Sequence, residues 1–379
     1  MPENTPAVAH TDVVIVGAGP AGLATAIRLG QRGIRRFVIV DRQNFPRDKT
    51  CGSAVTPSGI QILKQLGAYD AIAAQAHWID RINFNLARGR RVQLTSPLPQ
   101  MLVCSRRLLD QLLLERALAF GGGFVPNFNV SHLLQRGDRV RGVRSADGRE
   151  VHAEHTVVAE GVHSKLAPER GGRRLIQTIM GWWETAPSRH NELDFVYDRK
   201  LRPFYGWRFP EGPTCVNIGM GYDDPDGRIN ARDLFSGFLE RHYKDFVANS
   251  RQIGGWKGQP LSPSFKTEKL TSPGRIVVGE AGRIVDPASG EGIYQALHSG
   301  LLAAEALHEI FSRGTDPAAA LRKYEAACRN AFDGSLRFSR LIRAVFAHGG
   351  IEGLSRILPQ NLDLQWTGGH RRIDVSASM

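Results

Sequence analysis

Apolar and polar residues follow strand and helix periods in clearly separated parts of this chain. Residues 13–16 and 37–40 are short, wholly apolar runs, a pattern typical of strands buried on both faces. Between them, residues 21–30 carry apolar side chains at helical spacing, directly after a glycine-rich turn. The first forty residues therefore predict a strand–helix–strand unit.

The turn between this strand and this helix reads GAGPAG, residues 17–22. Gly17 permits the tight turn, Gly19 lets the backbone approach a pyrophosphate, and Gly22 lets the helix pack closely on the strand. Asp41 ends the second strand, where an acidic side chain can accept the hydroxyls of a ribose. The unit predicts a dinucleotide site, but it does not by itself distinguish NAD from FAD.

Two later stretches repeat the arrangement of a buried strand followed by a glycine-containing turn. Residues 154–166 predict a strand that ends at Glu160-Gly161. Residues 274–307 predict a strand, a GEAG turn, a proline–glycine loop and a long apolar helix that begins near Gly290. The backbone amides at the start of that helix can face a ligand and favour negative charge there.

Residues 176–222 alternate apolar and polar positions with turn signals between them, which predicts an antiparallel sheet. Tyr205, Trp207 and Phe209 lie two residues apart and therefore share one face of a strand. Two interpretations remain open at this point. The rings line an apolar substrate pocket, or they pack the sheet against a neighbouring helix.

The C-terminal part, residues 300–365, has helical periodicity. Phe338, Leu341, Ile342, Val345 and Phe346 recur at helical spacing, and Arg337, Arg340 and Arg343 occupy other faces of the same segment. This pattern fits either a helix lying on a membrane surface or a helix packed on the body of the protein. The last residues, 367–379, predict a polar, mobile tail.

Composition narrows the class of protein. The chain has 379 residues, of which 42% are hydrophobic and 23% charged, as expected for one large or two ordinary globular domains. The net charge is +12, but the basic residues are dispersed as arginine pairs and form no aromatic-interleaved stripe. We therefore expect no nucleic-acid partner, whereas contact with a membrane surface stays open.

The four cysteines, Cys51, Cys104, Cys215 and Cys328, are far apart and form no CxxC pair, which favours a reducing compartment. The N-terminus has no signal-peptide pattern, and no apolar run is long enough for a membrane span, so we expect a cytoplasmic protein. The histidines lack ligand spacing and no Gly-x-Ser-x-Gly motif occurs. We therefore expect neither a metal site nor a hydrolase triad.

Four stretches together resemble a known group: GAGPAG, FPRDKTCGSAVTPSG, PFYGWRFPEG and GEAGRIVDPASGEGIYQAL. They are similar to FAD-dependent oxidoreductases of the para-hydroxybenzoate hydroxylase superfamily, and within it to the geranylgeranyl reductase family. The resemblance runs from about residue 11 to residue 330. The last two stretches are the most specific, because the wider hydroxylase group usually lacks the Tyr-x-Trp-x-Phe-Pro run.

The resemblance implies an α/β fold, with a Rossmann-like FAD-binding domain, an interleaved antiparallel β-sheet substrate domain and C-terminal helices. The FAD-binding domain is expected to be discontinuous, over residues 1–75, 100–170 and 270–310. Residues 76–99 and 171–269 would form the substrate domain. Residues 311–379 would form the C-terminal helices and tail.

The resemblance also implies a set of site residues. Cys51 would lie beside the flavin ring, where it tunes the flavin, donates a proton or only packs, and it is the candidate catalytic residue. Tyr205, Trp207 and Phe209 would bind the substrate. The FAD-binding positions implied are Gly17, Gly19, Pro20, Ala21, Gly22, Asp41, Arg42, Cys51, Gly52, Arg106, Gly161, Glu280, Pro287, Gly290, Glu291, Gly292 and Ile293.

Three departures from the family pattern bear on function. Glu160 and Glu280 stand where aspartate is usual, and the longer side chain must be accommodated by a shift. Ser53 and Ala54 follow the Cys-Gly pair where family members often carry an acid and a glycine. FAD binding is still expected, but the family's specific substrate is not transferred to this chain.

The expected function is an FAD-dependent oxidoreductase that reduces a double bond, or otherwise oxidises or reduces a large apolar prenyl, quinone or aromatic substrate. With one dinucleotide fingerprint in the chain, electrons would come from transiently bound NAD(P)H or from a carrier or protein partner. One alternative is an aromatic monooxygenase that uses a flavin C4a-hydroperoxide. Another is a non-catalytic escort protein of the same fold. A halogenase is disfavoured because the Trp-x-Trp-x-Ile-Pro run is absent.

Overall fold

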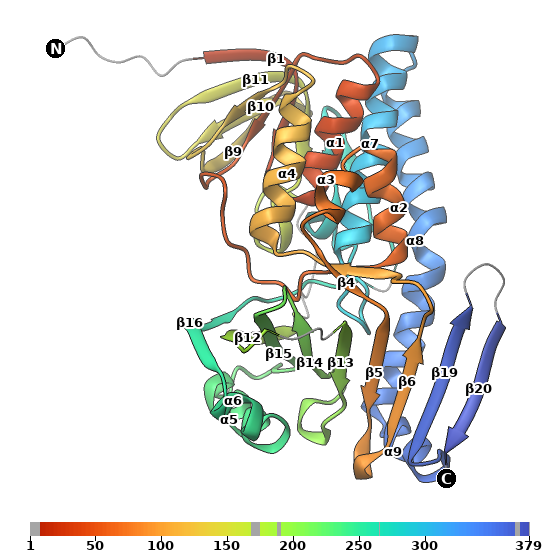
Figure 1. Ribbon diagram of the computed structural model, residues 1–379. Helices are drawn as coiled ribbons and strands as arrows, with labels where there is room; N and C mark the ends of the chain where they lie inside the picture. Colours follow the sequence, from red (N-terminus) through yellow and green to blue (C-terminus); the bar gives the residue numbers. More distant parts are fainter. Residues whose placement is uncertain (1–7, 168–174, 188–190, 265, 368–371, 379) are drawn as a thin grey trace.

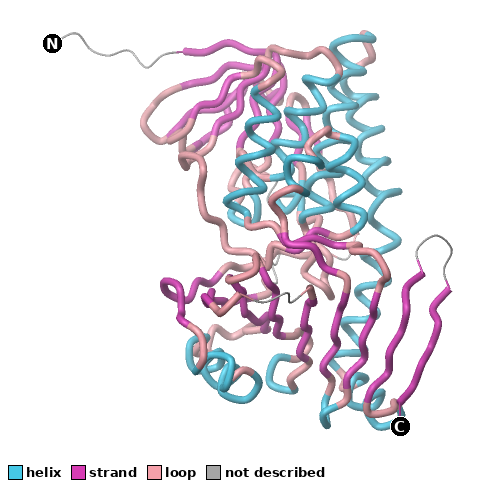
Figure 2. The backbone as a smooth tube through the Cα atoms, viewed as in Figure 1, coloured by secondary structure: helices cyan, strands magenta, loops and turns pink. Residues whose placement is uncertain are grey.

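The computed structural model describes residues 8–167, 175–187, 191–264, 266–367 and 372–378. An upper sheet carries most of the helices, and a lower sheet lies beneath it (Figure 1). The tube view shows the same division, with helices gathered along one side of the upper sheet (Figure 2). The predicted absence of a signal peptide concerns a segment whose first seven residues lie outside the described part.

The upper sheet has eight strands within the described residues and is built around five parallel ones. The strands predicted at residues 13–16 and 37–40 are confirmed and lie side by side in parallel register. An antiparallel meander extends the same sheet. In spatial order the parallel strands are β18 (Arg275–Val277), β11 (Glu150–Val158), β1 (Val8–Val16), β2 (Phe37–Val40) and β8 (Gly123–Val125), with β17 (Thr271–Ser272), β10 (Arg139–Ser145) and β9 (Val130–Arg136) antiparallel at the margins.

Helix α1 (Pro20–Gln31) packs against both α7 (Ile293–Arg313) and α4 (Arg106–Leu118). The first crossing is very close, since a Cβ on Gly300 would stand 2.2 Å from the Ala21 carbonyl oxygen. Helix α7 was predicted to begin near Gly290, but it begins three residues later because Gly290 has a left-handed φ of +67°. Short helices α2 (Pro57–Gln65) and α3 (Tyr69–Ala73) complete this layer.

Helix α8 (Pro317–Ala347) runs along both parts of the molecule (Figure 1). Near its start, the Tyr324 hydroxyl donates to the Val277 carbonyl at 2.8 Å, which ties it to the upper sheet. Near its end, the Phe346 ring packs edge-on against Tyr197, 5.2 Å away, in the lower part. The short helix α9 (Gly350–Ile357) follows. Helix α8 therefore braces the two parts against each other.

The lower sheet has nine strands in the described part of the chain. Helices α5 (Ala231–His242) and α6 (Lys244–Ala248) lie beside it, and Phe235 and Phe238 of α5 pack with Trp183 in a buried cluster. In spatial order the strands are β16 (Arg251–Gly258), β12 (Gln177–Glu184), β15 (Cys215–Tyr222), β14 (Gly206–Pro210), β13 (Glu192–Val196), β5 (Arg81–Asn85), β6 (Arg91–Thr95), β19 (Asn361–Thr367) and β20 (Arg372–Ser378).

One expectation about the lower part was confirmed and one was wrong. The strands within residues 176–222 pair antiparallel as predicted, and the sheet also contains two parallel pairs, β13 with β5 and β6 with β19. The helical segment was expected to reach residue 365 and to be followed by a mobile tail, yet β19 and β20 form a hairpin on the edge of β6. Residues 361–367 and 372–378 alternate apolar and polar positions, and a free sheet edge offers backbone partners to such a segment.

A small three-stranded sheet in the described residues joins the two parts. Its central strand pairs antiparallel with both neighbours. The strands are β3 (Ala54–Val55), β7 (Met101–Val103) and β4 (His77–Ile79). Because β3 begins two residues after Gly52, this sheet holds the segment that carries Cys51.

Candidate active site

A cavity of about 890 Å³ lies where the upper sheet meets the lower one. Val16, Val40 and Val278, at or just after the carboxyl ends of parallel strands, form part of its wall. Residues of β12 and β14 form the opposite wall. Ligands of open α/β sheets bind outside the carboxyl ends of the strands, so this is the expected place for a dinucleotide.

The glycine turn at the start of α1 forms one end of the cavity. Gly17 has a φ of +106°, and a Cβ on Gly22 would stand 2.0 Å from the Gly17 carbonyl oxygen. A Cβ on Gly19 would instead face Arg106 Nη2 at 3.7 Å, on the cavity side. No side chain caps α1 and its first turn has no acidic residue, so its N-terminal amides are available to an anion.

Asp41 lies at the end of β2 and is nearly buried. Its Oδ2 accepts a hydrogen bond from the Ala18 amide at 2.8 Å, and its Oδ1 accepts one from the Gln43 amide at 2.9 Å. Each carboxylate oxygen has capacity for a second donor. Asp41 thus holds the glycine turn in place and can still accept ribose hydroxyls.

Three cationic side chains meet beside the glycine turn. Arg106 donates to both oxygens of Asp110, at 2.8 and 2.7 Å, and Arg47 Nη2 lies 3.1 Å from the same carboxylate. The buried Nη1 atom of Arg47 has no hydrogen-bond partner among the described residues. Burial, reinforced by Arg106, lowers the pKa of Lys49. With two guanidinium groups on one carboxylate, the cluster retains positive charge for a pyrophosphate.

Glu160 and Glu280, the two unusual acids, are accommodated in different ways. Glu160 turns back on its own loop, where Oε2 accepts hydrogen bonds from Ser164 Oγ at 2.7 Å and from the Leu166 amide at 3.4 Å. Glu280 Oε1 accepts from the Ser262 amide at 3.1 Å. Burial raises the pKa of Glu280, and Lys49 opposes that rise. Neither carboxylate crowds the glycine turn of α1.

These residues fit FAD. The space around Gly19, the uncapped amides of α1 and the unpaired Arg47 Nη1 match a pyrophosphate. Asp41 matches the ribose of a dinucleotide. The start of α7, lined by Gly290, Glu291 and Gly292, supplies a second uncapped helix N-terminus on the cavity. When bound, FAD supplies two-electron chemistry, and the protein supplies position and electrostatics.

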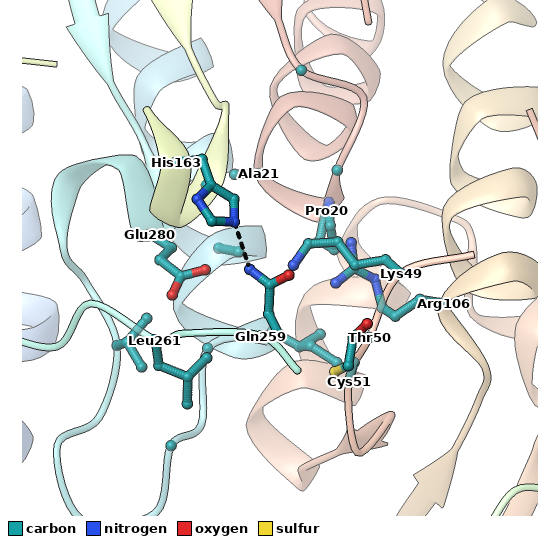
Figure 3. Close-up of a pocket in the computed structure, with 18 of the residues that line it drawn as sticks. Pro20, Ala21, Lys49, Thr50, Cys51, Arg106, His163, Gln259, Leu261 and Glu280 are labelled. Atoms are coloured by element: carbon teal, nitrogen blue, oxygen red, sulfur yellow. Dashed lines mark hydrogen bonds between the residues drawn. The ribbon is translucent and has the colours of Figure 1, made fainter. Parts of the chain in front are cut away.

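The Cys-Gly loop lies between the cationic cluster and the aromatic strand. Cys51 is half-buried, its Sγ accepts a hydrogen bond from the Ser53 amide at 3.3 Å, and Arg106 also bonds to it. Figure 3 shows Cys51 beneath Lys49 and Arg106 at the cavity wall. A Cβ on Gly52 would stand 3.2 Å from the Phe209 ring. The loop therefore contacts both the expected cofactor side and the expected substrate side.

An aromatic wall, defined here as Phe195, Tyr205, Trp207 and Phe209, lines the cavity beside this loop. Trp207 lies 6.3 Å from Tyr205 and 6.2 Å from Phe209 between ring centroids. Trp207 Nε1 donates to Asn217 Oδ1 at 2.7 Å, and the Tyr205 hydroxyl donates to the Ser289 carbonyl. The rings pack on one another and also line the cavity, and their role toward a substrate stays a prediction.

All the predicted site residues line this cavity except Gly22, which packs behind the turn, and Pro287, which is buried in the loop before α7. The sequence reasoning did not single out Arg47, Lys49 or Gln259. Gln259 bonds to His163 at 3.2 Å between Nε2 atoms (Figure 3). Arg47 and Lys49 belong to the FPRDK run just before Cys51. Their position beside the Cys-Gly pair was the sequence feature that could have marked them as site residues.

The described residues contain no group of three or more His, Cys, Asp or Glu side chains arranged to hold a metal ion. None of their helices combines the length and the apolar character that crossing a membrane requires.

Comparison with known proteins agrees with this geometry. The FAD binding domain family matches residues 10–195. Menaquinone reductase from Mycobacterium tuberculosis is 33% identical over 325 residues, covering 78% of this chain and 76% of that protein. Digeranylgeranylglycerophospholipid reductase from Methanocella arvoryzae is 26% identical over 359 residues, covering 88% and 86%.

Solved structures share the fold. A geranylgeranyl bacteriochlorophyll reductase-like protein from Thermoplasma acidophilum superposes with a TM-score of 0.82 at 20% identity, covering 92% of this chain and 91% of that one. A myxobacterial chondrochloren halogenase superposes with a TM-score of 0.75 at 20% identity, covering 87% and 82%. On the strength of the sequence relatives, the chain belongs to the geranylgeranyl reductase-like family of FAD-dependent oxidoreductases.

Proposed function

We propose that this enzyme reduces a double bond of a large prenylated substrate, such as a prenylquinone or prenylated lipid, with electrons passed through FAD. The observation that carries the proposal is the continuity of one cavity from the cationic cluster to the aromatic wall. The cationic cluster suits an anionic cofactor, and the aromatic wall suits an apolar chain. The names of the relatives, reductases of menaquinone and of a digeranylgeranyl lipid, support this substrate class.

The chain's own residues have positioning roles in this proposal. The glycine turn, Asp41 and Arg106 hold the dinucleotide, and the start of α7 favours negative charge on the cofactor ring. Cys51 and Gly52 lie where the cofactor ring would meet the substrate. Trp207 and Phe209 orient the apolar chain and exclude water from the reacting bond.

The electron donor in this proposal is NAD(P)H bound transiently, or a protein partner. The sequence holds one glycine-rich dinucleotide fingerprint, at residues 17–22, and we assign that one to FAD. Steady-state oxidation of NADH or NADPH by the FAD-loaded protein distinguishes these donors. Oxidation of neither would favour a partner protein.

We further propose that the enzyme takes its substrate from a membrane surface on the cytoplasmic side. Phe338, Leu341 and Val345 are 64%, 61% and 46% exposed and recur along one side of α8. Arg337 is exposed beside them and can meet anionic headgroups. Flotation with anionic vesicles tests this, and a triple change to serine at the apolar positions should abolish co-flotation.

Aromatic hydroxylation is the second candidate, favoured by the departure at Ser53 and Ala54. The non-catalytic escort is the third. One experiment separates them: the protein is incubated with FAD and freed of excess cofactor, reduced without oxygen, and incubated with a menaquinone either without oxygen or in air, and the product is analysed by mass spectrometry. A gain of two hydrogens in the prenyl chain supports the reductase, an added oxygen atom in air supports the hydroxylase, and failure to bind FAD supports the escort.

A further inference from the structure

A buried carboxylate stands behind the Cys-Gly loop, outside the site described so far. Glu211 follows β14 directly, and its amide donates to the Cys215 carbonyl at 2.8 Å across the hairpin to β15. Its side chain accepts hydrogen bonds from Trp182 of β12 and from Ser53. Glu211 does not line the cavity, whereas Ser53 does. Glu211 as a whole residue retains partial exposure to solvent.

Ser53 is held rigidly between this carboxylate and the cavity. It is 2% exposed and has a left-handed φ of +64°, which non-glycine residues adopt only where the surroundings hold them. Its carbonyl accepts a hydrogen bond from the Cys104 amide at 3.0 Å, and its Oγ lies 3.4 Å from the Cys51 carbonyl. The serine hydroxyl therefore has two acceptors for its one proton.

The direction of the hydrogen bond between these two side chains depends on the state of the carboxyl. An ionised Glu211 accepts the Ser53 proton, whereas a protonated Glu211 donates to Ser53 Oγ and leaves the serine proton free to point elsewhere. Burial raises the pKa of Glu211 to about 7, and Asp48 adds to this rise. Both states are then populated near neutral pH.

The two thiols around Glu211 stay protonated there. Cys104 and Cys215 face it from the start of α4 and from β15, and burial raises the pKa of these thiols to about 12 and 11. Lys257 stands 5.7 Å above the Trp182 ring. A change of charge near neutral pH in this cluster therefore belongs to Glu211.

We propose that Glu211 is the proton reservoir for the reaction in the cavity and that Ser53 relays the proton. The inference rests on the proposed function. Each reduced double bond takes a hydride, with its two electrons, from the reduced cofactor, and takes a proton from Ser53 Oγ. Ser53 regains that proton from Glu211, and Glu211 regains it from solvent.

The first test needs no turnover. In the FAD-loaded protein, the indole ¹H–¹⁵N signal of Trp182 should shift with pH, with a midpoint near 7, because its partner changes charge. The midpoint should vanish in Glu211→Gln and persist in Glu184→Gln, a change on the same strand β12 at a glutamate paired with Arg251 on the surface. A Trp182 signal that titrates identically in both variants would overturn the inference.

The second test measures turnover on a menaquinone. Glu211→Gln should lower kcat by about 100-fold, the typical contribution of a general acid, with little change in KM. It should also remove the step near neutral pH from the kcat–pH profile. Ser53→Gly, which suits the left-handed backbone, should lower kcat by the same factor. The double variant should lower kcat no further than either single variant. Unchanged kcat in either single variant overturns the relay. A wild-type enzyme that reduces no prenylated substrate contradicts the proposed function instead, and the indole titration then decides on Glu211 alone.

Discussion

Arg106 and Asp110 lie one turn apart on α4 and form a buried two-point ion pair, with contacts of 2.8 and 2.7 Å. Arg47, from the loop after β2, joins the same carboxylate. One aspartate thus orients two guanidinium groups on the wall of the cavity. Buried pairs of this kind are weak evidence for stability, so we assign this one to holding the cofactor.

Arg106→Gln should weaken FAD binding by about 10- to 100-fold, because a desolvated cation at a phosphate contributes roughly 1.4–2.8 kcal/mol. Fluorescence titration of the protein with FAD measures this. The matched control is Arg107→Gln, at the next position on α4, where the side chain is 55% exposed. Equal affinity in the two variants would show that Arg106 does not contact FAD.

Two glycine substitutions in one turn should separate binding from folding. Gly19→Ala places its methyl group no closer than 3.7 Å to any other residue, so the fold should tolerate it while FAD binding falls at least tenfold. Gly22→Ala would force a contact of 2.0 Å with the Gly17 carbonyl oxygen. We expect that change to lower the unfolding temperature of the FAD-free protein. Thermal unfolding with and without FAD tests both, and the reverse pattern would contradict the assignment.

Trp207→Phe should raise KM for a prenylated substrate about 10-fold while FAD binding stays unchanged, because it removes apolar surface and the bond to Asn217. Trp256→Phe is the control, since that ring packs against Phe235 in the separate cluster near α5. Steady-state kinetics on both variants gives the comparison. A similar KM change in the control would assign the effect to the sheet as a whole.

Stability should fall as pH rises from about 4.5 to 7, in part through Glu211. Its pKa is raised in the folded state, so the folded protein binds the proton more tightly than the unfolded one across that interval. The contribution is at most about 3.5 kcal/mol, from roughly 1.4 kcal/mol for each pKa unit. Denaturant unfolding at pH 5 and pH 8 should show a smaller decline in Glu211→Gln. An identical decline in wild type and variant would contradict the raised pKa.

The parts of the fold that depend on local pattern were predictable from sequence. The apolar runs around the glycine turn appear as β1 and β2 in parallel register, with Asp41 at the end of β2. Tyr205, Trp207 and Phe209 share a face because β14 has the period of two that their spacing requires. The domain boundaries and the roles of the individual site residues stay predictions.

The features that could not be predicted from the sequence depend on contacts between distant segments. Glu211 and Ser53 are 158 positions apart and meet only because β14 crosses behind the Cys-Gly loop. Arg47 reaches Asp110 from another loop, which no periodicity encodes. The hairpin of β19 and β20 was missed because its alternation is short and its pairing partner, β6, lies more than 260 residues earlier.

The most direct test of the central claim is the visible spectrum of the FAD-loaded protein after anaerobic reduction and rapid mixing with a prenylated lipid that has no quinone ring, so that its double bonds are the only electron acceptors. We predict that the oxidised flavin band returns without oxygen, at a rate that depends on the prenylated substrate, because the substrate accepts the electrons. Recovery of the band only when oxygen is admitted, through a transient near-ultraviolet species, would contradict the reductase and identify a monooxygenase.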